Sequence, residues 1–194
     1  SELIGRIPMK EMSFIREDYN GGIASEEFFD ITGYKNYSWY NNGNGFGSVF
    51  SDHMLVCDYK NGAWGTPEIV PFEPISLMPS AKIFHYGQSI FEGMKAYKDS
   101  DKKTWLFRPD ENFKRFNISA KRLSIPELPE AVFMEGLKAL LKVDDQWIPT
   151  QEGSSLYIRP IIFATGEGFH ASPADAYKFI ICTAPSGAYF AGKV

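Results

Sequence analysis

The sequence predicts an α+β fold, a sheet with helices packed on one of its faces. Strand-like apolar runs come first, two segments with helical periodicity follow, and strand-like runs return before residue 194. Strands followed by helices in this order are typical of such a layered fold. The hydrophobic fraction of 44%, with 15% aromatic residues, is enough for a substantial core.

Two hairpins are predicted in the first half of the chain. Asn61-Gly62 favours a type I′ turn, and Asp99-Ser100-Asp101 marks a second turn. The segment between Gly87 and Gly93 has two readings: a turn packed into the core, or a close approach to a ligand. The strands expected around these turns lie at 54–59, 63–64, 68–70, 91–97 and 104–107.

Two helices are expected next. The first begins where Asp110 caps it after Pro109, and Pro126 with Pro129 ends it. The second covers residues 130–143. The apolar positions that recur at helical spacing are Phe113, Phe116, Ala120 and Leu123 in the first helix, and Phe133, Leu137, Leu140 and Leu141 in the second. The strands that return are expected at 156–164 and 178–184.

Composition argues against several classes of function. Twenty basic and 24 acidic residues give a net charge of −4, which offers no basic footprint for nucleic acid. No apolar run is long enough to cross a membrane. The three histidines are not spaced as a metal pair, so we expect no metal site. Cys57 and Cys182 lie far apart in apolar runs, which predicts buried free thiols and a reducing compartment.

Two arginines stand beside or inside apolar patterns. Arg115 falls in the first helix between two phenylalanines, and it either extends to solvent or points at an anion. Arg159 lies within an apolar strand, where an unpaired guanidinium would cost several kcal/mol. It therefore needs a carboxylate or phosphate, which either the protein or a ligand could supply.

Five blocks of sequence, in order over residues 46–190, resemble the fold-type IV aminotransferases of the branched-chain type. The blocks are Phe46-Gly47 to Phe50-Ser51-Asp52-His53-Met54, His85-Tyr86-Gly87 to Phe91-Glu92-Gly93-Met94-Lys95-Ala96, Leu106-Phe107-Arg108-Pro109 to Ser119-Ala120-Lys121-Arg122-Leu123, Leu156-Tyr157-Ile158-Arg159-Pro160, and Gly187-Ala188-Tyr189-Phe190. The resemblance implies transfer of the amino group between leucine, isoleucine or valine and 2-oxoglutarate, with pyridoxal 5′-phosphate as cofactor.

The same resemblance implies roles for individual residues. Arg115 would bind the cofactor phosphate, and Arg159 would lie at the substrate pocket. The remaining positions that match pocket residues are Phe46, Tyr86, Phe91, Tyr157, Phe169, Ala171 and Tyr189. Phe169 and Ala171 would lie on a loop that crosses to the second subunit of a homodimer.

One position in that loop departs from the pattern. The family usually has a glycine where this chain has His170, and a larger aliphatic residue at Ala171. A histidine here could narrow the loop or add a titratable group near the pocket. Replacing His170 by glycine should then change the substrate ranking or its pH dependence.

The resemblance also implies a division of the chain. Residues 1–45 have no counterpart, residues 46–184 would form the small domain, and residues 185–194 would begin the interdomain loop. The Schiff-base lysine would come from a C-terminal cofactor domain beyond residue 194. We therefore expect no catalytic lysine in these residues, and no turnover of leucine and 2-oxoglutarate by the 194-residue chain alone.

Other interpretations share parts of this pattern. Within the fold, the alternatives are a D-amino acid aminotransferase or an aminodeoxychorismate lyase. From another class, the alternative is a non-catalytic domain that only dimerises. The expected location is the cytoplasm, or the mitochondrial matrix if the source is eukaryotic.

Overall fold

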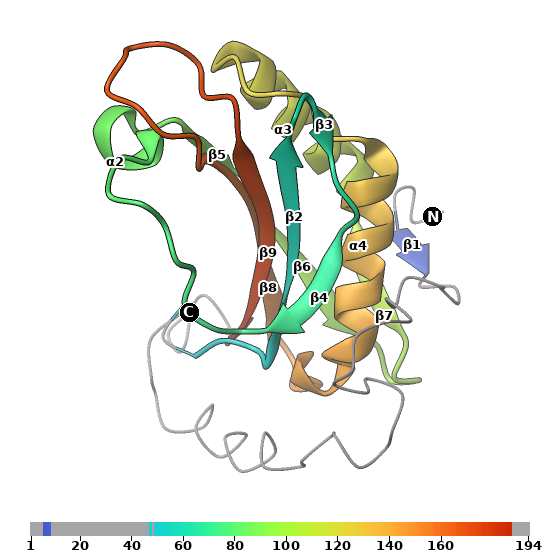
Figure 1. The fold of residues 1–194 in the computed structure, drawn as a ribbon. Helices are drawn as coiled ribbons and strands as arrows, with labels where there is room; N and C mark the ends of the chain where they lie inside the picture. The colour runs from blue at the N-terminus through green and yellow to red at the C-terminus, as the bar shows by residue number, and fades with distance from the viewer. Residues whose placement is uncertain (1–5, 9–46, 48, 188–194) are drawn as a thin grey trace, which may run out of the picture.

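A single antiparallel sheet is the frame of the molecule (Figure 1). The computed structural model describes residues 6–8, 47 and 49–187, and within them it has nine strands. Their bounds are β1 Arg6–Pro8, β2 His53–Lys60, β3 Ala63–Trp64, β4 Glu68–Pro71, β5 Ser89–Phe91, β6 Met94–Lys98, β7 Thr104–Phe107, β8 Ser155–Ala164 and β9 Tyr177–Ser186. The strand order is β1-β7-β6-β8-β9-β2-β3, with β4 on β2 and β5 on β8.

Strands β8 and β9 are the longest in the sheet and lie side by side in it. They pair along their whole length, from Ser155 opposite Ser186 to Ala164 opposite Tyr177. Side chains on one face, such as Ile158 and Phe179, belong to the main apolar core. Because successive side chains alternate between faces, Arg159, next to Ile158, and Cys182, which pairs with Arg159, point to the other side.

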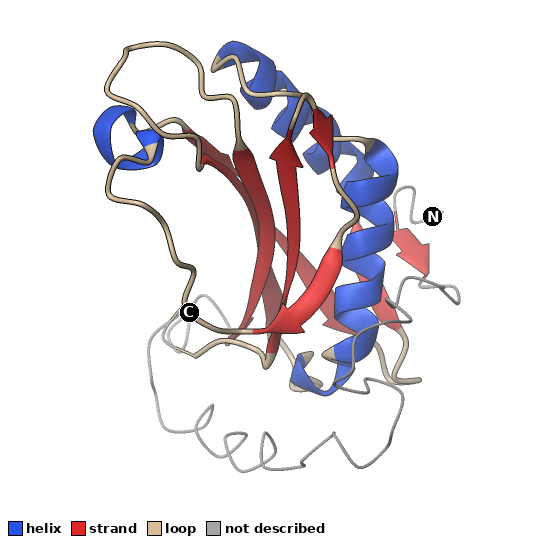
Figure 2. Cartoon of the chain, viewed as in Figure 1, coloured by secondary structure: helices blue, strands red, loops and turns tan. Residues whose placement is uncertain are grey.

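The two long helices cover one face of the sheet (Figure 2), so the predicted α+β architecture is confirmed. The helices are α2 Lys82–Tyr86, α3 Pro109–Arg122, α4 Glu130–Val143 and the 3₁₀ helix η3 Asp145–Trp147. The rings of Phe116 and Phe133 on α3 and α4 lie 5.9 and 6.1 Å from Phe179 on β9. This aromatic contact joins both helices to the sheet. The side of the sheet away from α3 and α4 is called the opposite face below.

Most predicted elements agree with the structure, but the strand expected at 91–97 is divided between β5 and β6, and the first helix ends at Arg122, before Pro126. Asn61 and Gly62 both have positive φ, as a type I′ turn requires. The first helix begins at Pro109, so the prediction that Asp110 caps it is wrong. Pro109 occupies the first helical position because it has no N–H to leave unpaired, and Asp110 lies in the first turn. The short helix α2 was not predicted, since five residues show no periodicity.

The structure also bears on the predictions for the N-terminal residues, the two cysteines and membrane-spanning segments. In residues 1–45 the structure describes only β1, which pairs with β7. Cys57 is buried and Cys182 is partly buried, and neither forms a disulfide. Burial raises the pKa of each thiol to about 11. Among the described residues no helix has the length and apolar character to cross a membrane.

A histidine–aspartate pair ties the end of α4 to the start of β2. Asp144 is fully buried, and its carboxylate accepts the backbone N–H of His53 at 3.1 Å and contacts the His53 ring nitrogen Nδ1 at 2.7 Å. The hydrogen bond to Asp144 raises the pKa of His53 against the lowering effect of burial, and the nearby Asp52 adds to the rise. Protonated His53 therefore stabilises the fold.

We expect the stabilisation by His53 to depend on pH. Because the folded pKa lies above the unfolded value, the contribution is complete below about pH 6 and disappears as the pH rises through the folded pKa. His53→Ala should lower the free energy of unfolding by about 1–3 kcal/mol at pH 5.5 and by less at pH 9. Urea unfolding at both pH values measures this, with His170→Ala in an exposed loop as the control. An equal loss at both pH values would contradict the role of protonation.

Candidate functional site

Arg159 lies in the middle of β8, on the opposite face of the sheet. Its neighbours Ile158 and Pro160 are buried on the helix side, whereas Arg159 is only partly buried. Its guanidinium donates from Nε and Nη2 to the hydroxyl of Tyr157, at 3.1 and 2.8 Å. No carboxylate of the described residues forms an ion pair with it. Within the described residues its hydrogen-bond partner is therefore the neutral hydroxyl of Tyr157.

Aromatic rings surround the Arg159 guanidinium. Its central carbon lies 4.4 Å from the ring centre of Phe91 and 5.2 Å from that of Tyr157. Such rings attract a cation and also hold its plane in a fixed orientation. Phe91 is 61% exposed, so one side of this cluster faces outward. The three side chains, called the Arg159 cluster below, form a pre-oriented cation with an apolar wall.

Gly93 makes room for the Arg159 cluster. It lies between β5 and β6, which pair with β8 in one continuous register. A Cβ at Gly93 would lie 2.5 Å from Oη and 3.2 Å from Cζ of Tyr157. A side chain at this position would therefore displace the Tyr157 hydroxyl that accepts from Arg159.

The neighbouring residue Glu92 points to the other side of the sheet and meets α3. Glu92 is 5% exposed, and Arg115 donates to its carboxylate from Nε at 2.5 Å and from Nη2 at 2.7 Å. Asn112 on α3 donates to it at 3.0 Å, and the N–H of Gly93 at 3.3 Å. Burial alone would raise the pKa of Glu92, but these hydrogen bonds prevail and hold it below its usual value. Glu92 is thus a buried carboxylate that orients Arg115.

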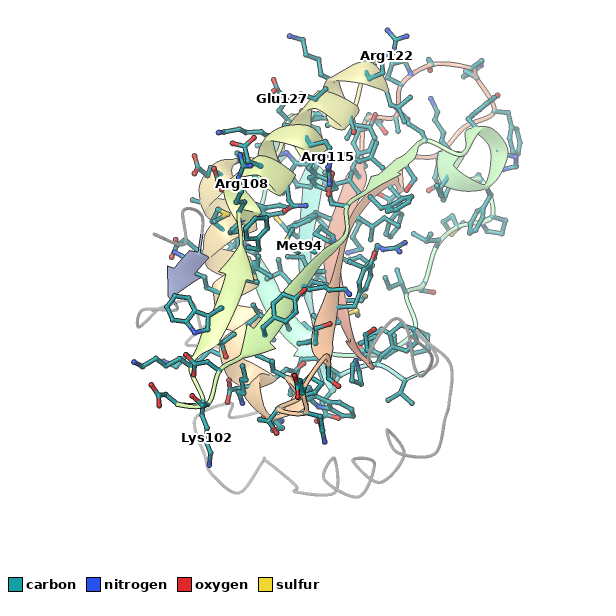
Figure 3. All side chains as sticks on the ribbon, turned by 180° about the vertical axis from the view of Figure 1, so that it is seen from behind. Met94, Lys102, Arg108, Arg115, Arg122 and Glu127 are labelled. Atoms are coloured by element: carbon teal, nitrogen blue, oxygen red, sulfur yellow. The ribbon has the colours of Figure 1, made fainter. Side chains whose placement is uncertain are left out.

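Arg115 keeps donors for a ligand while it holds Glu92. A guanidinium has five N–H groups, and only two of them are used by the carboxylate. The remaining N–H groups have no acceptor among the described residues, and 65% of the side chain is exposed. Figure 3 shows Arg115 midway along α3, with Arg108 and Arg122 at its two ends. The donor set fits a phosphate group, which binds best to oriented arginine donors.

A loop from Thr165 to Ala176, called the 165–176 loop below, forms the third part of the site. Phe169 is 73% exposed at its tip and contacts the ring of His85 at 4.9 Å in an edge-on arrangement. The hydroxyl of Tyr86 donates to the carbonyl of Phe169. Ala171 lies in the same tip and is exposed. Helix α2 and the loop tip are therefore held together (Figure 1).

The predicted site residues fall into separate groups. Phe91, Tyr157 and Arg159 come together, Tyr86 contacts Phe169, and Arg115 lies across the sheet from the Arg159 cluster. Phe46 and Tyr189 lie outside the described residues. Sequence reasoning did not identify Glu92, although a carboxylate beside a glycine in an apolar strand was a signal. In the described segments no group of three metal-ligating side chains is close enough to hold an ion.

Three curated proteins similar to this chain are all branched-chain aminotransferases by name. They are the branched-chain-amino-acid transaminase 1 of Bacillus subtilis, 44% identical over 75% of this chain, the branched-chain-amino-acid aminotransferase of Mycolicibacterium smegmatis, 45% identical over 77%, and the probable branched-chain-amino-acid aminotransferase of Staphylococcus aureus, 49% identical over 77%. The alignments cover 41–42% of those proteins. This chain thus spans about two fifths of the relatives it matches. No family model matches it.

Solved structures give the same result for the fold. The branched-chain amino acid aminotransferase of Escherichia coli superposes with a TM-score of 0.52 at 26% identity, over 72% of this chain and 41% of that one. A second solved branched-chain amino acid aminotransferase, which was crystallised with pyridoxamine 5′-phosphate, gives 0.51 at 28% identity, over 70% and 41%. The resemblance to branched-chain aminotransferases and the fold that it implies are confirmed.

Gly93→Ala should destabilise the protein through its contact with Tyr157. The new methyl group would displace the ring, at a cost of about 1–3 kcal/mol in the free energy of unfolding. In a Tyr157→Phe background the 2.5 Å contact is removed, and the same substitution should cost less. Gly65→Ala is the matched control, because its Cβ would meet its nearest neighbour at 3.4 Å. Urea unfolding of the four combinations measures the coupling, and additive losses would contradict this account.

Proposed function

Because this chain is similar in sequence and fold to part of the branched-chain aminotransferases, we propose that it carries the small domain of such an enzyme. Residues 46–184 form that domain, and residues 185–194 begin the interdomain loop. The protein transfers the amino group between leucine, isoleucine or valine and 2-oxoglutarate. The observation that carries the proposal is Arg159, a cation held between aromatic rings with no carboxylate partner among the described residues.

Arg159 binds a carboxylate of the amino acid or of the 2-oxo acid. Its hydrogen bonds to the Tyr157 hydroxyl and its position over Phe91 fix the guanidinium before the substrate arrives. The exposed ring of Phe91 forms an apolar wall for a branched aliphatic side chain, together with Phe46. Tyr86 and Tyr189 complete the pocket. Recognition of one charge and one apolar group suits an amino acid with an aliphatic side chain.

Arg115 binds the phosphate of pyridoxal 5′-phosphate, with the N–H groups that Glu92 leaves free. Glu92 fixes the guanidinium by a two-point contact, so little orientational freedom is lost when phosphate binds. The cofactor, when bound, supplies the electron sink that amino transfer requires. No lysine of these 194 residues is assigned to hold it.

The protein forms a homodimer in which the 165–176 loop reaches the pocket of the second subunit. The 73% exposure of Phe169 at the loop tip supports a contact with another surface. Phe169 and Ala171 are the residues that this loop contributes to the pocket. Two free cysteines among the described residues suit a cytoplasmic protein.

Substitution of Arg159 and of Arg115 should change different kinetic parameters. In the protein expressed from its complete gene, leucine-dependent glutamate formation from 2-oxoglutarate measures the activity. Arg159→Gln should raise the KM for leucine and 2-oxoglutarate roughly 10- to 100-fold and leave the half-saturating cofactor concentration unchanged. Arg115→Gln should raise that cofactor concentration by a similar factor. Arg122→Gln, at the exposed end of α3, is the matched control.

Absence of turnover with the branched-chain amino acids would contradict the proposed function. Turnover of D-amino acids instead would place the protein elsewhere among the fold-type IV enzymes. If Arg115→Gln and Arg159→Gln changed the same parameter, the division of roles between phosphate and carboxylate would be wrong.

A further inference from the structure

Lys82, the first residue of α2, is a buried cation with an unusual set of partners. Only 6% of the residue is exposed. Its ammonium donates to the carbonyl and hydroxyl of Ser172 at 3.0 and 2.8 Å, and to the carbonyl of Pro173 at 3.3 Å. All three acceptors are neutral and belong to the 165–176 loop. No carboxylate of the described residues forms an ion pair with Lys82.

These hydrogen bonds oppose movement of the loop away from Lys82. A buried ammonium is stable only when its N–H groups are hydrogen-bonded, because burial removes the water that would otherwise solvate the charge. Ser172 and Pro173 supply the three acceptors that match its three protons. Any shift of this part of the loop would break these hydrogen bonds. The side chain therefore acts as an anchor and not as a base or nucleophile.

Backbone hydrogen bonds also attach Lys82 and the nearby Ser80 to the first half of the 165–176 loop. The N–H of Lys82 donates to the carbonyl of Gly166 at 2.9 Å, and the N–H of Gly168 donates to the carbonyl of Ser80 at 3.0 Å. Gly168 has a φ of 129°, and a Cβ there would lie 3.7 Å from Cε of Lys82. The lysine stem thus passes beside a loop position that favours glycine, and Lys82 contacts both halves of the loop.

The anchored segment leads directly to the exposed tip. Ser172 donates its N–H to the carbonyl of His170 at 2.9 Å, so the anchor and the tip share one turn. Tyr86, at the other end of α2, holds the carbonyl of Phe169. The two ends of α2 therefore both contact the loop near its tip, Lys82 through Ser172 and Tyr86 through Phe169.

We propose that Lys82 is a positioning residue that sets the place of Phe169 and Ala171 and thereby the substrate affinity of the pocket that they line. This inference rests on the proposed function for the pocket, whereas the anchor itself rests on the contacts of Lys82. The ammonium does not touch the substrate. It acts through Ser172 and Pro173, which determine where the loop tip is presented.

The test uses the protein expressed from its complete gene, with Lys82→Met, Ser172→Ala and Lys82→Arg. Hydrogen exchange reports on the loop, and steady-state kinetics with leucine, isoleucine and valine report on the pocket. Lys82→Met should speed exchange of the Ser172 and Ala174 amides at least about tenfold and leave α4 unchanged. It should raise the KM values about tenfold, change their ranking, and alter kcat by less than about threefold.

Two further variants keep the test decisive if Lys82→Met folds poorly. Ser172→Ala removes one acceptor and leaves two carbonyls, so it should give a smaller change in the same direction. Lys82→Arg keeps the charge and should restore part of the loop protection. Lys142→Met, at an exposed position in the last turn of α4, is the control and should match the wild type in both measurements.

The outcomes separate the anchor from the function. Wild-type exchange in Lys82→Met would overturn the anchor. Faster exchange with unchanged KM values and ranking would overturn the positioning role. If the wild-type protein has no transaminase activity, the proposed function fails, and the exchange of the Ser172 and Ala174 amides still tests whether Lys82 holds the loop.

Discussion

The charge of Arg159 is the constraint around which this sheet is organised. A guanidinium in a central strand must be held and paired, because the neighbouring apolar strands offer it little solvation. The Tyr157 hydroxyl and the Phe91 ring hold it, and the absence of a side chain at Gly93 makes that arrangement possible. No described carboxylate neutralises it. The strand thus presents a fixed positive charge on the face opposite α3 and α4.

Strand alternation separates this charge from the second one. Phe91 and Gly93 face the Arg159 side, whereas Glu92 between them faces α3 and holds Arg115. One three-residue segment therefore supports both arginines from opposite faces of the same sheet. In the proposed enzyme this separation allows one cation to bind a carboxylate while the other binds a phosphate. Arg115 is itself neutralised in part by Glu92, so its spare donors, more than its net charge, are what a phosphate would meet.

The sequence was sufficient for the long elements and insufficient for contacts between distant residues. Strands and helices with clear periodicity, such as 130–143, were predicted because one face of each is apolar. Helix α2 was missed because it is short and is held by the 165–176 loop and not by its own pattern. Arg159 could be recognised as a charge that needs an anion, but its contact with Phe91, which is distant in sequence, could not be predicted. Glu92 and Lys82 became visible only with their partners in space.

The central claim is that Arg159 receives a carboxylate and Arg115 a phosphate. Arginine side chains labelled with ¹⁵N report on each guanidinium separately when Arg159→Gln and Arg115→Gln are used to assign the signals. Titration of the labelled protein with 4-methyl-2-oxopentanoate, and separately with inorganic phosphate, tests the claim most directly. The Nε signal of Arg159 should shift with the 2-oxo acid and that of Arg115 with phosphate. Movement of the Arg159 signal with neither ligand, or of both signals with both ligands alike, would contradict it.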